Sequence, residues 1–231
     1  GLIVGRAAGG WLMRYAGPGH LLTFAPTRTG KGVGVVLPNL LTVDRAILCV
    51  DPKGENARIA ARARGRFGPV HVLDPFEVSG QTAAYNPLAA LDPFGADLAE
   101  DAALIAEALV YDPPEHISEA HWNEEAKALI AGLILRVVTH PPPQGQTLAA
   151  VRDLLTTAPE RFAATLKAMQ ASPAADGLVA RAANRHLGKA DREAAGVLSA
   201  AQRHTHFLDS RRITDSLARS DFAFEDLRDR R

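Results

Sequence analysis

The segment from residue 21 to 37 constrains the fold of this chain more than any other. It reads Leu-Leu-Thr-Phe-Ala-Pro-Thr-Arg-Thr-Gly-Lys-Gly-Val-Gly-Val-Val-Leu: an apolar run, a loop rich in Thr, Gly and Lys, and a second apolar run. In a loop of this kind the backbone N–H groups turn inward, and the following helix directs the positive end of its dipole at the same point. The layout therefore predicts a strand, a phosphate-binding loop and a helix.

The loop departs from the usual phosphate-loop pattern at two positions. Ala25 stands where the first glycine is expected, and Gly32 stands where a Ser or Thr would bind magnesium. Lys31 remains as a mobile charge for the β- and γ-phosphates. An ordinary strand–turn–helix corner is the alternative, but the strand and helix flanks favour phosphate binding. The expected contacts come from seven residues: Thr27, Arg28, Thr29, Gly30, Lys31, Gly32 and Val33.

Composition places the chain among ordinary globular proteins. Of its 231 residues 47% are apolar and 23% are charged, which argues against disorder and against a membrane protein. No stretch approaches the ~20 unbroken apolar residues that cross a bilayer. Lys plus Arg and Asp plus Glu both number 26, so any nucleic-acid contact must be local. The single cysteine, Cys49, lies in an apolar run and is expected to be buried, in a reducing compartment.

The first third of the chain alternates between expected strands and helices. Residues 2–4 and 11–13 flank a Gly-rich turn and predict a hairpin. Strands are then expected over 21–24, 46–50 and 70–73, and helices over about 30–41 and 55–64. This order predicts an α/β fold with a parallel sheet and right-handed crossovers. Because Gly34 lies four residues before Pro38, we expect a kink in the first helix.

From about Asp97 onward the sequence becomes alanine-rich, with helical spacing. Seven residues follow the i, i+4, i+7, i+8 pattern of one helix face: Trp122, Ala126, Leu129, Ile130, Leu133, Ile134 and Val137. Four helices are expected: one capped by Ser118 and ended by Pro141–Pro143, one opened by a Thr157–Glu160 capping box and running to about Gln170, one over 174–187 and one over 191–206. The middle of the chain therefore predicts an all-helical block of roughly 110 residues.

Two aspartates follow the expected strands. Asp51 ends the 46–50 run and Asp74 ends the 70–73 run, and the carboxyl ends of parallel strands share the edge that carries the phosphate loop. Asp51 and Asp74 are therefore both expected to face the nucleotide. The turn Asp51-Pro-Lys-Gly-Glu55 is dense in charged groups, so Asp51, Lys53 and Glu55 are the candidate binding residues. Because Gly32 lacks a hydroxyl, Mg²⁺ would be held by phosphates, water and Asp51. The alternative is a strand-to-helix turn with Glu55 in the favourable first turn of the helix.

The basic clusters carry a weaker signal. Arg58 and Arg62 share a helix face near Arg64 and Arg66, where a solvated face is favoured over a phosphate contact. The same interpretation applies to a later group: Arg203, His204, His206, Arg211 and Arg212. The histidines are too isolated to predict a metal site.

Four segments together resemble the type IV secretion coupling proteins of the VirD4/TraG class. They occur in the family's order over nearly the whole chain: Ala25 to Leu41 around the loop, Val50-Asp-Pro-Lys-Gly-Glu-Asn56, Tyr85-Asn-Pro-Leu88 and His121-Trp-Asn-Glu-Glu-Ala-Lys127. The combination is far more specific than the loop alone. Glycine after the loop lysine is tolerated in this family, so Gly32 agrees with the resemblance.

The resemblance implies a RecA-like domain that binds ATP and Mg²⁺ and is interrupted by an all-α domain. Residues 1–95 would be the first part of the nucleotide-binding domain, 96–206 the insertion and 207–231 the start of the return. Lys31 would bind phosphate. The family implies a homo-hexamer at the cytoplasmic face of the bacterial inner membrane. It passes single-stranded DNA with its relaxase, or effector proteins, to a secretion channel, and the all-α domain recognises the substrate.

Two parts of the family pattern are missing from these residues. One is the N-terminal transmembrane segment, and the other is a later apolar strand ending in Asp-Glu that activates water. Asp51 does not take that role, because another strand lies between the two motifs in a RecA-like sheet. We therefore expect a soluble fragment that binds nucleotide weakly and hydrolyses none alone.

Two other functions stay open on the sequence. In a small P-loop kinase, the strand of Asp51 would lie directly beside the loop strand and the helical block would be a lid. In a non-hydrolysing adaptor, the loop would bind no nucleotide and the helical block would dock a protein.

Overall fold

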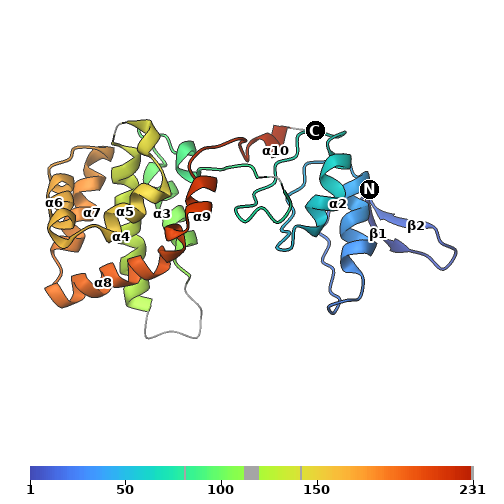
Figure 1. The fold of residues 1–231 in the computed structure, drawn as a ribbon, viewed down its shortest axis with the longest axis horizontal. Helices are drawn as coiled ribbons and strands as arrows, with labels where there is room; N and C mark the ends of the chain where they lie inside the picture. Colours follow the sequence, from blue (N-terminus) through green and yellow to red (C-terminus); the bar gives the residue numbers. More distant parts are fainter. Residues whose placement is uncertain (81, 112–119, 141, 230–231) are drawn as a thin grey trace. The chain divides into compact units, whose positions relative to one another are not determined.

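The computed structural model describes residues 1–80, 82–111, 120–140 and 142–229. The chain divides into two compact units, unit 1 with residues 1–83 and 221–231, and unit 2 with residues 84–220 (Figure 1). The described residues are rich in helix and form one small sheet of two strands. Among them, no helix has the length and apolar character needed to cross a membrane.

Unit 1 opens with the expected hairpin. Strands β1 (Leu2–Arg6) and β2 (Leu12–Tyr15) pair antiparallel, with an irregularity between Ile3 and Gly5. The turn closes where Ala7 donates its N–H to the Trp11 carbonyl at 2.9 Å, and Gly10 supplies the left-handed backbone that the turn requires (φ 81°). The hairpin prediction is confirmed.

The three expected parallel strands do not form. Residues 21–24, 46–50 and 70–73 carry no strand assignment, and their apolar side chains face solvent, with Leu22 82%, Phe24 88% and Val50 84% exposed. Such runs are typical of strands buried on both faces, and each needs a hydrogen-bonded neighbour on both edges. Without those neighbours none of the three segments forms a strand, although the Val72 carbonyl accepts from the N–H of Ala83 at 2.7 Å. The prediction of a buried Cys49 is wrong for the same reason, since this residue is exposed.

The helices of unit 1 follow the prediction more closely. The helix expected over about 30–41 is present as a π-helical turn, η1 (Gly32–Val36), that leads into α1 (Leu37–Thr42). The irregularity agrees with the expected kink, because Pro38 has no N–H to donate and the turn before it widens. Helix α2 spans Glu55–Arg64 as predicted. A last short helix, α10, spans Asp226–Asp229.

The regular secondary structure of unit 2 is all helical in its described residues. Its helices are α3 (Leu98–Leu109), α4 (Ala120–Val138), α5 (Leu148–Thr156), α6 (Pro159–Gln170), α7 (Leu178–Leu187), α8 (Asp191–His204) and α9 (Arg211–Ser216). Short 3₁₀ turns connect them: η2 (Pro87–Ala90), η4 (Pro143–Gly145), η5 (Ala175–Gly177) and η6 (His206–Asp209). The all-helical prediction for this part of the chain is confirmed.

Some details of the helix ends differ from the prediction. The prediction of a Thr157–Glu160 capping box is wrong, because the N-cap of α6 is Ala158, which makes no side-chain hydrogen bond. Pro159 occupies the first helical position, where a backbone N–H has no intrahelical partner and its absence costs nothing. The helix expected from residue 174 begins at Leu178, since Asp176 is left-handed (φ 52°). Ser118 and Pro141 lie outside the described residues.

Helix α4 is the centre of unit 2. Helices α3, α5, α7 and α8 pack on it (Figure 1). Side chains such as Ile130, Leu133 and Ile134 are fully buried. Two glycines allow close approach at this core. A Cβ at Gly132 would lie 2.5 Å from the Cβ of Ala182 in α7, and one at Gly196 of α8 would lie 2.6 Å from Cζ3 of Trp122.

The chain enters and leaves unit 2 through paired segments. The N–H of Tyr85 donates to the Ser216 carbonyl at 2.8 Å, and the N–H of Asn86 donates to Oγ of Ser220 at 3.1 Å. The buried Asn86 side chain also donates to the Gln146 carbonyl at 2.8 Å. These bonds tie both ends of unit 2 to its own helical core.

Gly132→Ala should lower the free energy of unfolding by about 1–2 kcal/mol. Overpacking a tight core costs about 1–3 kcal/mol, which exceeds the helix-propensity gain of up to about 1 kcal/mol. Thermal unfolding followed by circular dichroism measures the change. Gly145→Ala is the matched control, because a Cβ there meets nothing within 4 Å. Equal melting temperatures for the two variants would contradict the close packing of α4 and α7.

Candidate functional site

The loop before η1 has the geometry of an anion-binding turn. Arg28 (φ 64°) and Gly30 (φ 86°) are both left-handed, and alternation of left- and right-handed residues turns successive N–H groups to one side. The hydroxyl of Thr29 donates to the Pro26 carbonyl at 2.8 Å and braces the turn. Arg28 pays a steric cost of about 1 kcal/mol for this conformation, a strain that is common at functional sites.

Four consecutive backbone N–H groups at this turn have no hydrogen-bond partner in the part of the chain that the structure describes. Gly34 donates to the Gly30 carbonyl at 2.7 Å and is the first donor of the helical segment. Before it, the N–H groups of residues 30 to 33 donate to no described residue. Free N–H groups at a helix start attract negative charge, because the helix dipole reinforces them. The loop therefore offers a set of donors for a phosphate.

The amine of Lys31 lies over its own loop. Its Nζ donates to the carbonyl of Pro26 at 2.9 Å and to that of Ala25. The side chain is half-buried, and these two bonds keep its charge at the start of the loop. Both bonds are to neutral carbonyls, which a phosphate oxygen can replace with a stronger charge-assisted bond.

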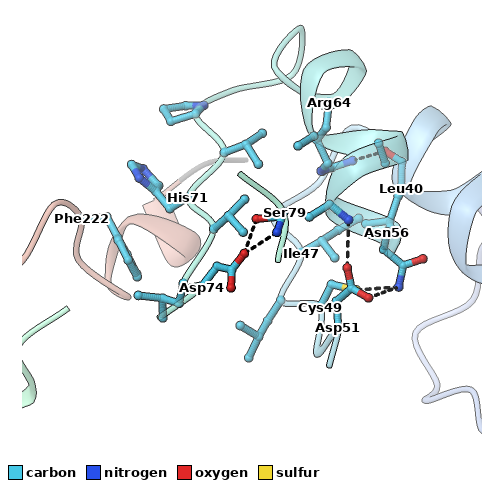
Figure 2. Close-up of a pocket in the computed structure, with 18 of the residues that line it drawn as sticks. Leu40, Ile47, Cys49, Asp51, Asn56, Arg64, His71, Asp74, Ser79 and Phe222 are labelled. Carbon is cyan, nitrogen blue, oxygen red and sulfur yellow. Dashed lines mark hydrogen bonds between the residues drawn. The ribbon is translucent and has the colours of Figure 1, made fainter. Parts of the chain in front are cut away.

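The helical segment behind the loop is held by arginines at the end of α2. Arg64 donates to the carbonyls of Leu40 at 2.9 Å and Val43 at 2.8 Å, and also to that of Arg45 (Figure 2). Arg66 donates to the Leu41 carbonyl. Free carbonyls at the C-terminal end of α1 attract positive charge. The sequence indicated a solvated basic face, whereas Arg64 serves as a clamp on α1.

A separate cavity of about 920 Å³ lies beside α2 within unit 1 (Figure 2). It collects Asp51 and Asp74 between the extended segments around 46–51 and 69–79 and residues from 222 to 227. The loop residues 27–33 do not line it. The structure thus brings the two predicted carboxylates into one cavity but does not include the phosphate loop in that cavity.

Both carboxylates of this cavity accept hydrogen bonds from nearby backbone N–H groups. Oδ2 of Asp51 accepts from the N–H of Ala57 at 2.9 Å, and Oδ1 accepts from Asn56 Nδ2 at 3.5 Å, so Asp51 caps the start of α2 (Figure 2). Oδ2 of Asp74 accepts from both the hydroxyl and the N–H of Ser79, and these bonds lower the pKa of Asp74.

The same cavity contains the thiol of Cys49. Partial desolvation, and then the Asp51 carboxylate, raise the pKa of this thiol.

The remaining predicted residues flank these features. Lys53 and Glu55 are exposed at the turn into α2, where Gly54 is left-handed (φ 64°) and Glu55 occupies the favourable first helical position. Within the described residues, no cluster of three or more His, Cys, Asp or Glu could hold a metal ion. Sequence reasoning missed Asn39 and Ser79 and the carbonyl contacts of Arg64, because nothing in a local pattern shows which distant carbonyl or carboxylate a polar side chain will meet.

The segment 121–127 lies in α4 and carries an ion network. Glu125 accepts from Arg185 at 2.7 Å and pairs with Lys189 at 2.8 Å, and Lys189 also reaches Glu193 at 3.1 Å. Hydrogen bonding to Arg185, followed by Lys189, lowers the pKa of Glu125 to about 2. The network ties α4 to α7 and α8. The network therefore has a structural role.

The family model described as "Type IV secretory system Conjugative DNA transfer" matches residues 2–231. The chain therefore belongs to the type IV secretion coupling proteins of the TraG/VirD4 class, as the four motif segments indicated.

Individual relatives agree with this assignment. The chain is 29% identical to the Escherichia coli conjugal transfer protein TraG over 250 residues, which is 98% of this chain and 39% of TraG. A second TraG from Escherichia coli is 28% identical over 95% of this chain. The VirD4 protein of Agrobacterium fabrum is 42% identical over 101 residues, which is 40% of this chain and 15% of VirD4. The chain spans about two fifths of the length of the TraG relatives.

Arg64→Ala should destabilise α1 by about 1–3 kcal/mol, because several carbonyls lose a charged donor. Amide hydrogen exchange of residues 37–45 should become correspondingly faster. Arg62→Ala is the matched control, since Arg62 is exposed on the same helix and donates to no described residue. Identical exchange in the two variants would contradict the clamp.

Glu125→Gln should flatten the acid limb of the stability curve. A carboxylate with a lowered pKa stabilises the fold above its unfolded value near 4.5, and this contribution is lost as the pH falls toward 2. Denaturation measured between pH 6 and pH 2 should show wild type losing more stability than the variant. Glu160→Gln, at an exposed position, should follow wild type. Parallel curves for all three proteins would contradict the network.

Proposed function

We propose that the loop from Thr27 to Val33 binds the phosphates of ATP. The observation that supports this is the run of four free N–H groups at residues 30–33 beside the Lys31 amine. The donor set fits a polyphosphate, because backbone N–H groups and one mobile ammonium match its negative oxygens without a specific side chain. Thr27, Arg28 and Thr29 would contribute from the same turn.

Magnesium would reach this site through the nucleotide. Gly32 offers no hydroxyl, so phosphate oxygens and water would supply most ligands. Asp51, Lys53 and Glu55 are the chain's further candidates, and Asp51 already uses one carboxylate oxygen on the Ala57 N–H. When bound, Mg²⁺ neutralises phosphate charge.

We further propose that the chain is part of an ATP-driven motor in conjugative transfer. In this role unit 2 would recruit a relaxase or effector protein, and single-stranded DNA would pass to a secretion channel. The proposal extends to a homo-hexamer at the cytoplasmic face of the inner membrane, in a RecA-like arrangement with an inserted all-α domain. Support comes from family membership and from relatives named for conjugal transfer.

Lys31→Ala should weaken binding of a fluorescent ATP analogue at least tenfold. A hydrogen bond from a charged group contributes about 1.5–3 kcal/mol, and the backbone donors alone cannot replace it. Lys167→Ala, at an exposed position on α6, should bind like wild type. Tight binding that is unchanged in Lys31→Ala would place the nucleotide elsewhere. No binding by any of the proteins would favour the adaptor function.

A further inference from the structure

The side chain of Asn39 joins two parts of unit 1 through three hydrogen bonds. Its Nδ2 donates to the carbonyl of Ile3 in β1 and to the carbonyl of Val35 in η1, both at 2.8 Å. Its Oδ1 accepts from the N–H of Ile3 at 2.8 Å. The amide therefore uses both of its protons and its oxygen.

Two of these bonds imitate a strand partner. Ile3 is only 2% exposed, so its N–H and carbonyl would be costly to leave unpaired. The amide of Asn39 satisfies both groups at once, in the place where a third strand would otherwise lie along β1. The hairpin is thus attached to α1 by a two-point contact.

The third bond connects the same amide to the phosphate loop. Val35 belongs to the π-helical turn Gly32–Val36, and Gly32 and Val33 of that turn are among the residues whose N–H groups donate to no described residue. Because Pro38 cannot donate a backbone bond, the turn has fewer internal restraints, and the Asn39 side chain supplies one. A shift of β1 is therefore transmitted through Asn39 to the helical turn that orients the N–H groups of residues 30–33.

We propose that Asn39 is a positioning residue that couples the β1–β2 hairpin to the phosphate loop, so that the placement of the hairpin regulates nucleotide affinity. The effect on nucleotide affinity rests on the proposed function, whereas the structural coupling does not. Coupling between two sites is reciprocal. A nucleotide bound at the loop therefore strengthens the attachment of Ile3 by the same factor that the attached hairpin strengthens nucleotide binding.

The first test needs no nucleotide. In ¹H–¹⁵N spectra, Asn39→Ala should shift the amide resonances of Gly30, Gly32 and Gly34 and speed exchange of the Ile3 amide. Thr42→Ala is the matched control, because it removes one side-chain bond of the same helix, to the Pro38 carbonyl at 2.6 Å, and Thr42 has no hydrogen bond to the described residues of the hairpin. Asn39→Asp keeps the acceptor for Ile3 and loses both donations, so it serves if Asn39→Ala unfolds. If the amide resonances of Gly30, Gly32 and Gly34 do not shift in the folded variant, the coupling is overturned.

The second test uses a non-hydrolysable ATP analogue. Wild type and Thr42→Ala should bind with equal affinity, whereas Asn39→Ala should bind at least about fivefold more weakly, within the usual range of coupling between sites. The analogue should slow exchange of the Ile3 amide in wild type by a similar factor. Equal affinity for Asn39→Ala would overturn the proposal. Wild type that binds no analogue, with loop glycines that still respond to Asn39→Ala, would refute the nucleotide site and leave the coupling intact.

Discussion

The proposed nucleotide site depends on the backbone N–H groups of residues 30–33, which donate to no residue that the structure describes. Left-handed conformations at Arg28 and Gly30 turn these groups to one side, and they lie at the start of the helical segment, ahead of its first bond from Gly34 to Gly30. Unpaired N–H groups are tolerated at a surface because water satisfies them, and they become an anion site when the loop is held in one shape. The surrounding bonds do the holding: Thr29 on Pro26, Asn39 on Val35 and Arg64 on the end of α1.

The two units are stabilised by different means. Unit 2 has a continuous apolar core around α4, with paired entry and exit segments that close it on itself. Unit 1 relies on polar anchors, since Asn39, Arg64, Asp51 and Asp74 each satisfy backbone groups that a completed sheet would otherwise organise. Its apolar segments at 21–24, 46–50 and 70–73 remain uncovered. This contrast accounts for the cavity beside α2.

Local pattern predicted what depends on local structure. Helical spacing located α4 and α8, turn residues located the hairpin, and the proline with its preceding glycines located the irregular helix at η1. The prediction of three parallel strands was wrong, because a continuous apolar run shows that a segment suits a buried strand but does not show which neighbouring strand will pair with it. The exposure of Cys49 follows from the same missing neighbours. Long-range polar contacts such as Asn39 to Ile3, 36 residues apart, leave no periodic signal.

The most direct measurement is the ¹H–¹⁵N spectrum of the chain as Mg²⁺ and ATP are added. If the loop binds nucleotide, the amide resonances of Gly30 and Gly32 should shift with a saturable dependence on ATP. Those of Gly80 and Gly145, which lie outside the loop, should not shift. Adenosine without phosphates should leave all four unmoved. Saturable shifts confined to residues outside 27–33, or no shift at the loop at any ATP concentration, would contradict the claim that these N–H groups form a nucleotide site.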